Sequence, residues 1–174
     1  MKRNNLPHGE QLIDLCNNAV QKLFRAHSTK YLTGATGIIS NPNLQRVRRP
    51  RDMPFAIHKA LNEWFVDRFG VDYRGGSLFC TGDAAIAAGY KKESSTLISI
   101  EPLDDYSVCY STKCKDLFGY YQFYWSAADT PIEKIRADMD SLGFVHQSNG
   151  GLQAAATSGH EVMLVAERFR YSLS

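Results

Sequence analysis

Hydrophobic positions recur at helical spacing in three stretches of the chain. The first spans residues 8–26, the second runs from Pro54 to Gly70, and the third runs from Pro131 to Gly143. Intervals of three and four residues place the apolar side chains of each stretch on one helix face. These side chains are Leu12, Leu15, Cys16, Ala19, Leu23 and Phe24, then Ile57, Leu61, Trp64 and Phe65, and then Ile132, Ile135, Met139 and Leu142. We therefore expect three amphipathic helices.

Residues typical of helix starts support these boundaries. Asp52 is placed to cap the second helix, and Thr130-Pro131-Ile132-Glu133 is a capping box with a proline in the first turn of the third. Gly82-Asp83 opens a further, alanine-rich helix that ends near Tyr90, with Asp83 as its cap.

Short apolar or β-branched runs between turn-forming residues predict strands. They cover residues 44–48, 77–81, 96–100, 105–111, 161–166 and 169–173. Residues 33–42 and 147–159 are rich in turn formers and small residues, which indicates loops. The aromatic cluster at 120–125 fits either kind of element. Helices at the front and middle with strands mostly later predict one α+β domain over residues 1–174.

Length and composition agree with a folded domain of this kind. The 174 residues are 44% hydrophobic and 22% charged, which excludes a disordered, collagen-like or coiled-coil chain. No apolar run approaches the roughly 20 residues of a membrane span, and residues 1–7 lack the apolar segment of a signal peptide. The cysteines, at positions 16, 80, 109 and 114, have neither CxxC nor zinc-finger spacing. We expect a cytoplasmic protein with reduced thiols, no metal and no membrane partner.

Charge is distributed unevenly along the chain. Residues 1–51 carry nine Lys and Arg residues against Glu10 and Asp14, whereas the remainder is net negative. This basic first third indicates an anionic partner such as a phosphate, a nucleotide or a nucleic acid. A solvated basic face is the alternative.

Three segments carry candidate chemistry. In residues 44–52, strand alternation would place Arg46 and Arg48 on one face, where a guanidinium suits a pyrophosphate. In residues 79–83, the Thr81 hydroxyl at a strand end can orient a carboxylate or a sugar hydroxyl. Glu161 stands at the head of an apolar strand, where it can stabilise positive charge in a cleft. Taken singly, the segments also fit a basic strand edge, an ordinary strand–turn–helix junction and a solvated glutamate.

In their order along the chain, these segments resemble the mono-ADP-ribosyltransferase family. Its cholera/pertussis-toxin-like group has an Arg, Ser/Thr, Glu signature. That group opens its core with an aliphatic or aromatic residue and an Arg, followed by an Arg-Pro-rich stretch and an acid, which residues 44–52 resemble. Its second motif, an aromatic strand that ends in Ser-Thr-Ser before a helix with Ala and an aromatic residue, is similar to residues 79–83 and 87–90, with Thr81 in place of the first Ser. Its glutamate before an apolar strand is similar to Glu161.

The resemblance implies a fold of two small antiparallel sheets that form an NAD cleft with flanking helices. Residues 44–173 would be the catalytic core and residues 1–43 a helical N-terminal lobe. Glu161 would stabilise the oxocarbenium ion that forms when the nicotinamide–ribose bond breaks, and Thr81 would hold Glu161 or the ribose in place. Arg46 would bind the NAD phosphate or buttress the cleft, and Arg49 would be a second anion contact. Phe79 or Tyr90 would line the nicotinamide side.

Transfer of ADP-ribose to a macromolecular acceptor, a protein or a nucleic acid, is the expected activity. Residues 147–159 would present the acceptor. Gly159 stands two residues before the glutamate, where protein-modifying members often have Glu or Gln, and the missing side chain argues against modification of arginine. This and the reduction of Ser-Thr-Ser to Cys80-Thr81-Gly82 are two departures from the family pattern. They leave open another side chain, a nucleic acid, hydrolysis of NAD or an inactive site. The small size fits a bacterial or phage effector.

Other classes of function remain open at this point. A nucleic-acid-binding module would use the basic first third together with Tyr120, Tyr121, Phe123, Tyr124 and Trp125 as a stacking surface. An accessory protein would keep the fold without the chemistry. A nuclease or hydrolase using His and Glu finds no support in a Ser/His/Asp order or a metal-ligand cluster.

Overall fold

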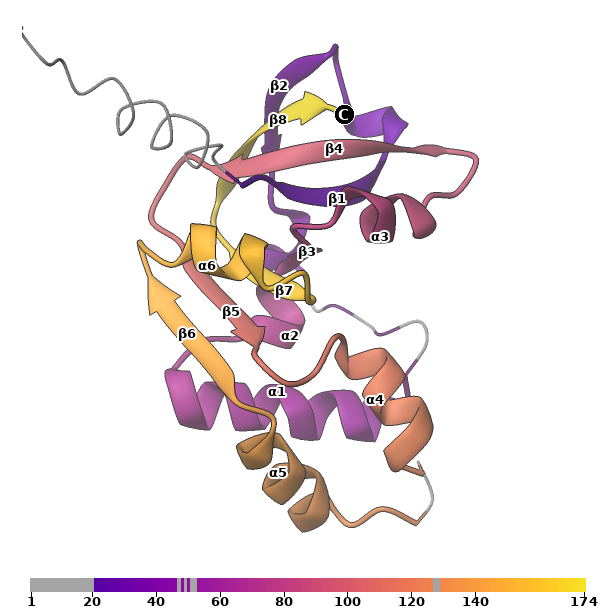
Figure 1. Cartoon of the computed structure of the whole chain (residues 1–174), viewed down its shortest axis with the longest axis vertical. Helices are drawn as coiled ribbons and strands as arrows, with labels where there is room; N and C mark the ends of the chain where they lie inside the picture. Colours follow the sequence, from indigo (N-terminus) through magenta and orange to yellow (C-terminus); the bar gives the residue numbers. More distant parts are fainter. Residues whose placement is uncertain (1–20, 47, 49, 51–52, 127–128) are drawn as a thin grey trace, which may run out of the picture.

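Two four-stranded antiparallel sheets form the framework of the molecule (Figure 1). The computed structural model describes residues 21–46, 48, 50, 53–126 and 129–174. The first sheet has the order β1-β4-β8-β2, built from Leu23–Ser28, Ser95–Pro102, Arg168–Leu173 and Thr36–Ser40. The second has the order β3-β7-β5-β6, built from Leu78–Cys80, Val162–Val165, Ser107–Ser111 and Phe144–Ser148. The expected α+β class is confirmed.

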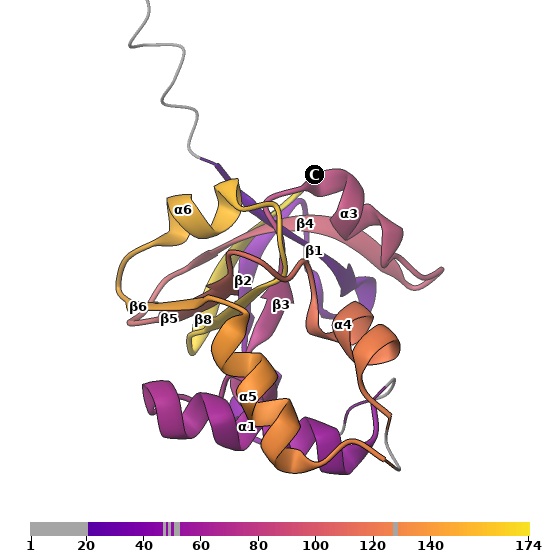
Figure 2. The same cartoon turned by 60° about the horizontal axis from the view of Figure 1, so that its bottom comes forward.

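Most of the helices lie beyond the second sheet, on the side away from the first (Figure 1). These are α1 (Phe55–Phe69), α2 (Tyr73–Gly76), α4 (Leu117–Tyr124) and α5 (Ile132–Ser141). Figure 2 shows α1 and α5 packed side by side. In addition, α3 (Ala84–Gly89) packs on β1, α6 (Leu152–Thr157) packs on β5, and 3₁₀ turns form at Thr29–Tyr31 and Pro42–Leu44. No helix in the described part of the chain is long and apolar enough to cross a membrane.

The second sheet is the middle layer, and it is buried on both faces. Along β7, Val162 and Leu164 join the core between the two sheets, whereas Met163 joins the core formed with the helices. Side chains alternate between the faces of a strand, so a strand covered on both sides must be apolar throughout. This explains the unbroken Val-Met-Leu-Val sequence that leads away from Glu161.

A short backbone pairing joins the two sheets. Phe24 of β1 and Thr81, directly after β3, exchange both of their N–H···O hydrogen bonds, at 2.7 and 3.0 Å. The start of the first sheet is thereby fixed next to the β3–α3 junction. These two segments are far apart along the chain, and the pairing brings their side chains to one place.

Several elements confirm the expectations from the sequence. Helix α1 ends at Gly70, which has the left-handed φ of 71° that glycine favours, and the Asp83 side chain caps α3 by accepting from the N–H groups of Ala85 and Ile86. The strands expected at 77–81, 96–100, 105–111, 161–166 and 169–173 are all present. Helix α5 forms, but the capping box does not, because Pro131 is the N-cap and the Thr130 hydroxyl accepts from the Ser126 N–H. Asp52 lies outside the described residues.

Other elements correct those expectations. Residues 23–26, expected at the end of a helix in a helical lobe, belong to β1, because all six residues of that strand pair with β4. The expected loops at 33–42 and 147–159 contain β2 and α6. The expected strand at 44–48 is absent from the described residues there, which form a 3₁₀ turn and a bend. The aromatic cluster at 120–125 is largely helix α4.

Candidate active site

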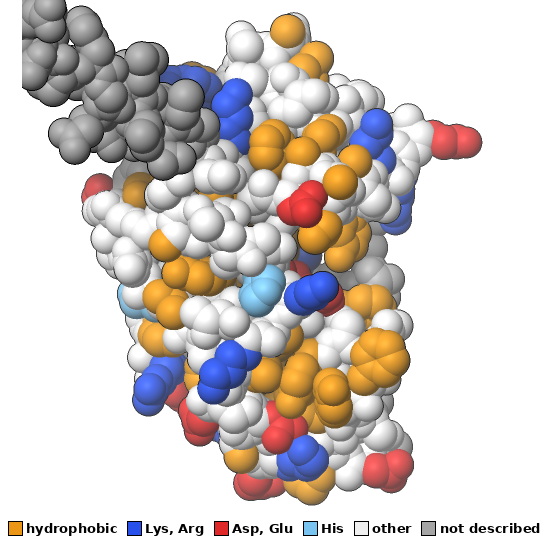
Figure 3. Space-filling model, viewed as in Figure 1, with side chains coloured by type: hydrophobic (Ala, Val, Ile, Leu, Met, Phe, Trp, Pro, Cys, Tyr) orange, Lys and Arg blue, Asp and Glu red, His pale blue; other side chains and the backbone are white. Residues whose placement is uncertain are grey.

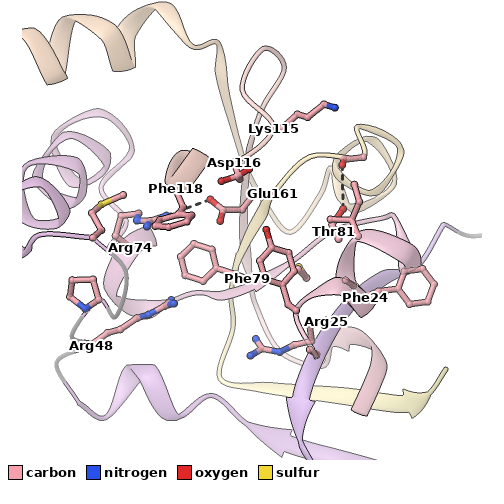
Figure 4. A pocket seen from close by; sticks show the side chains of 18 of the residues that line it. Phe24, Arg25, Arg48, Arg74, Phe79, Thr81, Lys115, Asp116, Phe118 and Glu161 are labelled. Carbon is pink, nitrogen blue, oxygen red and sulfur yellow. Dashed lines mark hydrogen bonds and ion pairs between the residues drawn. The ribbon is translucent and has the colours of Figure 1, made fainter. Parts of the chain in front are cut away.

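A pocket of about 430 Å³ opens where β1 meets the end of β3. Its walls come from both sheets, from α3 and from the loop before α4, and Figure 4 shows the side chains that line it. A volume in this range is typical of sites for small molecules and cofactors. The polar groups within the pocket therefore decide what it can bind.

Glu161 is the principal carboxylate of the pocket. It lies immediately before β7, and its backbone N–H donates to the carbonyl of Lys115 at 2.6 Å. One carboxylate oxygen, Oε1, lies 3.4 Å from Nη1 of Arg74, and both side chains are largely buried. Burial raises the pKa of Glu161, and Arg74 opposes that rise. The ion pair therefore favours the charged carboxylate inside the pocket.

Thr81 supports the turn that precedes Glu161. Its hydroxyl donates to the carbonyl of Gly159 at 3.3 Å and accepts from the N–H of Asp83 at 3.2 Å. Figure 4 shows the first of these bonds as a dashed line. Thr81 thus positions the backbone two residues before the carboxylate rather than the carboxylate itself.

Arg25 brings a cation into the pocket from β1. Its Nε and Nη1 atoms are buried and have no hydrogen-bond partner in the part of the chain that the structure describes. Burial lowers its pKa, but a guanidinium stays protonated in proteins. A buried cation of this kind is costly unless an anion joins it. Arg25 therefore indicates a bound anion.

Two more guanidinium groups lie against Phe79. The guanidinium carbon of Arg48 is 4.2 Å from the ring centroid, and that of Arg74 is 4.9 Å away. Both distances are typical of cation–π contacts. His58 of α1 also lines the pocket, and burial and the nearby Arg74 and Arg48 lower its pKa to about 4. It is consequently neutral near pH 7.

The charges that line the pocket favour an anionic ligand. Among the described lining residues, the cations are Arg25, Arg48, Arg74 and Lys115, and the acids are Asp116 and Glu161. The surplus of positive charge suits phosphate groups, and a carboxylate in the same pocket suits a cationic centre that forms during a reaction. Apolar side chains gather over α3 and α4, the helices that border the pocket (Figure 3).

The structure brings most of the site residues expected from the sequence into this pocket. Glu161, Thr81, Phe79 and Tyr90 all line it, with Tyr90 on the exposed rim. Arg46 does not: it is exposed and is not among the lining residues, because the strand alternation that would have turned it inward does not exist. Arg49 lies outside the described residues.

Arg25, Arg74 and His58 were not expected from the sequence. A signal for Arg25 exists, because Leu23-Phe24-Arg25 is also an aliphatic residue, an aromatic residue and an Arg at the start of a core. The helical spacing of residues 8–26 concealed it. Arg74 and His58 reach the pocket because of the way α1 and α2 pack, and no local sequence pattern predicts that packing.

Other chemistry is poorly supported by the described residues. Burial raises the pKa of Cys80 and Cys114 to about 12, so neither thiol supplies a thiolate nucleophile at neutral pH. His160 is not among the lining residues, and its Nδ1 lies 2.7 Å from the carbonyl of Ser111. The described residues contain no cluster of three or more His, Cys, Asp or Glu side chains that would hold a metal ion.

Comparisons of the chain with protein-family models, with curated proteins and with solved structures give no match. Function must therefore be inferred from the chemistry of the pocket.

Proposed function

We propose that the pocket binds NAD and that the protein transfers ADP-ribose from it to a macromolecular acceptor. The observation that carries this proposal is the convergence of Arg25, Thr81 and Glu161 on one pocket. In chain order these are an Arg, a Thr and a Glu, each at or next to a strand. The resemblance to the mono-ADP-ribosyltransferase family requires this order, with the arginine role at Arg25 instead of Arg46.

The charges of the pocket suit each part of the reaction. Arg25 would bind a phosphate of NAD, which would supply a partner for nitrogens that have none among the described residues. When the bond between ribose C1′ and nicotinamide breaks, its electron pair goes to the nicotinamide ring and leaves an oxocarbenium ion. The carboxylate of Glu161 would stabilise that cation and accept a hydrogen bond from the ribose 2′-hydroxyl. A nucleophile of the acceptor then attacks C1′ and releases a proton.

Helix α4 gives less support to a nucleic-acid-binding module. Trp125 is buried in the core and Tyr120 packs against it, so neither offers a free stacking face. Phe123 and Tyr124 are exposed, but Leu117–Tyr124 contains no Lys or Arg to contact phosphates.

The test follows both halves of the substrate. The protein is incubated with a cell extract and NAD that carries one label in the nicotinamide ring and another in the adenylate phosphate. We expect release of nicotinamide and transfer of the phosphate label to protein or nucleic acid. Glu161→Gln should lower nicotinamide release by roughly 100-fold or more while the protein stays folded.

Glu93→Gln is the matched control, because it changes an exposed acid in a turn away from the pocket. It should retain the activity of the unchanged protein. Activity in Glu161→Gln equal to that of the control would overturn the proposed mechanism. NAD binding without turnover in the unchanged protein would indicate an accessory role instead.

A further inference from the structure

Arg74 is held beside Glu161 by a short helix that the rest of the fold fixes in place. The Asp72 side chain caps α2 by accepting from the N–H of Gly75, and the backbone N–H of Arg74 donates to the Asn62 side chain on α1. Arg74 is only 8% exposed, and its Nε is buried without a hydrogen-bond partner in the described part of the chain. Its guanidinium therefore has little freedom to leave the carboxylate.

Glu161 needs a cation at this place to remain charged. Burial raises its pKa, and the nearby carboxylate of Asp116 raises it further. Protonation of Glu161 would remove the negative charge that stabilises an oxocarbenium ion. Arg74 opposes this protonation, because its Nη1 lies 3.4 Å from Oε1 of Glu161.

We propose that Arg74 is a positioning residue that keeps Glu161 ionised and aimed into the pocket before any ligand arrives. The cations of the pocket would thereby have different roles. Arg74 would serve the carboxylate, whereas Arg25, which has no acidic partner among the described residues, would serve the ligand. Figure 4 shows Arg25 well apart from Arg74, which faces Glu161. The catalytic consequence rests on the proposed function, but the effect on Glu161 itself does not.

The titration of Glu161 can be distinguished from that of the thiols and the phenol that surround it. The groups that face it from the neighbouring elements are Arg48 and Arg74, Asp116, the thiols of Cys80, Cys109 and Cys114, and the hydroxyl of Tyr90. Burial raises the pKa of each of these thiols and of Tyr90, so they stay neutral in the range where carboxylates titrate. These thiols and this hydroxyl therefore do not contribute to a change seen in that range, and the midpoint of Glu161 is read from its own assigned signal.

The test measures the protonation of the Glu161 carboxylate directly, and a second experiment measures the rate of NAD cleavage. Protein labelled with ¹³C at glutamate side-chain carboxyls is titrated by NMR, and the signal lost in Glu161→Gln assigns the residue. In Arg74→Gln we expect the midpoint of Glu161 to rise by about one pH unit or more, which is roughly a tenfold change in proton affinity. Arg74→Lys, which keeps the charge, should give an intermediate midpoint.

Lys115→Gln is the matched control for loss of a pocket cation. Its side chain points away from Glu161 in Figure 4, so the midpoint of Glu161 should not move. In the NAD assay, Arg74→Gln should lose about tenfold or more in rate near pH 6 and regain much of it near pH 9. A purely structural role would lower the rate equally at every pH.

The outcomes separate this inference from the proposed function. An unchanged midpoint in both folded Arg74 variants would overturn the positioning role, whatever the protein does with NAD. A raised midpoint in a protein that never cleaves NAD would support that role and contradict the proposed function. If Arg74→Gln does not fold, Arg74→Met decides, because methionine fills a similar space without a charge, and an unchanged midpoint of Glu161 in that variant would overturn the positioning role.

Discussion

The partly buried Arg25 links stability to function in this molecule. Nε and Nη1 of Arg25 are buried without a hydrogen-bond partner among the described residues, and this arrangement opposes folding. Its removal should therefore affect the free energy of unfolding and the affinity for ligand in opposite directions. In Arg25→Gln we expect the free energy of unfolding, measured by urea denaturation, to equal that of the unchanged protein or to exceed it by about 1 kcal/mol.

The same substitution should weaken NAD binding. A charge-assisted hydrogen bond contributes about 1.5–3 kcal/mol, so calorimetry should show a Kd about 10- to 100-fold higher for Arg25→Gln. Arg170→Gln is the control, because it removes an exposed arginine of the same sheet that pairs with Glu101. A variant that loses stability but keeps its affinity would show that Arg25 is a structural residue.

At the scale of elements, the β3–α3 junction depends on a glycine. A side chain at position 82 would place its Cβ 1.8 Å from the backbone oxygen of Ala156 in α6. A backbone atom cannot move without displacing its helix, so Gly82→Ala must push α6 away from the junction that carries Thr81. We expect a loss of about 2 kcal/mol or more in the free energy of unfolding, together with reduced NAD turnover.

Gly89 supplies the matched substitution for this test. It is the last residue of α3, and a Cβ there would meet nothing within 4 Å. Gly89→Ala should stabilise the protein by about 0.5–1 kcal/mol, because alanine loses less backbone entropy in a helix. Equal effects of the two substitutions in thermal denaturation would mean that the contact with α6 does not constrain the junction.

The elements that the sequence predicted correctly are those whose pattern is local. Helix α1 has its apolar stripe and its terminal Gly70, and β7 has an apolar run after a turn. Strands β1 and β2 were missed because distant partners define them. The residues of β1 also fit a helical spacing, and Gly37 in β2 suggests a turn until Tyr171 of the paired strand is seen to occupy the space where a side chain would be.

The residues of the candidate site also fall into those that local patterns predict and those that distant contacts place. Glu161 and Thr81 stand at strand ends that local patterns indicate, and both line the pocket. The position of Arg46 was inferred from alternation along a strand that does not form. Arg25 could be found only by recognising β1, and Arg74 only from the packing of α2 against the second sheet.

At the scale of the whole molecule, one partly buried and one buried histidine couple both layers of the fold to pH. His27 lies on β1 in the first sheet, and His58 lies on α1 beneath the second. Burial is the main cause that lowers the pKa of each to about 4, and nearby arginines lower it further. Nε2 of His27 and Nδ1 of His58 are buried without hydrogen-bond partners in the described residues. Both rings are therefore neutral in the native state at mildly acidic pH.

This arrangement should make the protein sensitive to mild acid. In the unfolded chain, histidines bind protons as the pH falls through about 6.5, whereas the native protein binds them only near pH 4. The stabilisation is thus complete above pH 6.5 and is lost progressively between 6.5 and 4. After allowance for solvent screening, we expect each histidine to account for roughly 1–2 kcal/mol of the loss between pH 7 and 4.5.

Urea denaturation of His27→Gln and His58→Gln at both pH values should show a smaller loss in each variant, and the two reductions should add because the residues lie in separate layers. The exposed charge pair of Arg136 and Asp67 offers a control, since Arg136→Gln should leave the loss unchanged. A loss of the same size in both histidine variants would mean that the acid sensitivity arises elsewhere.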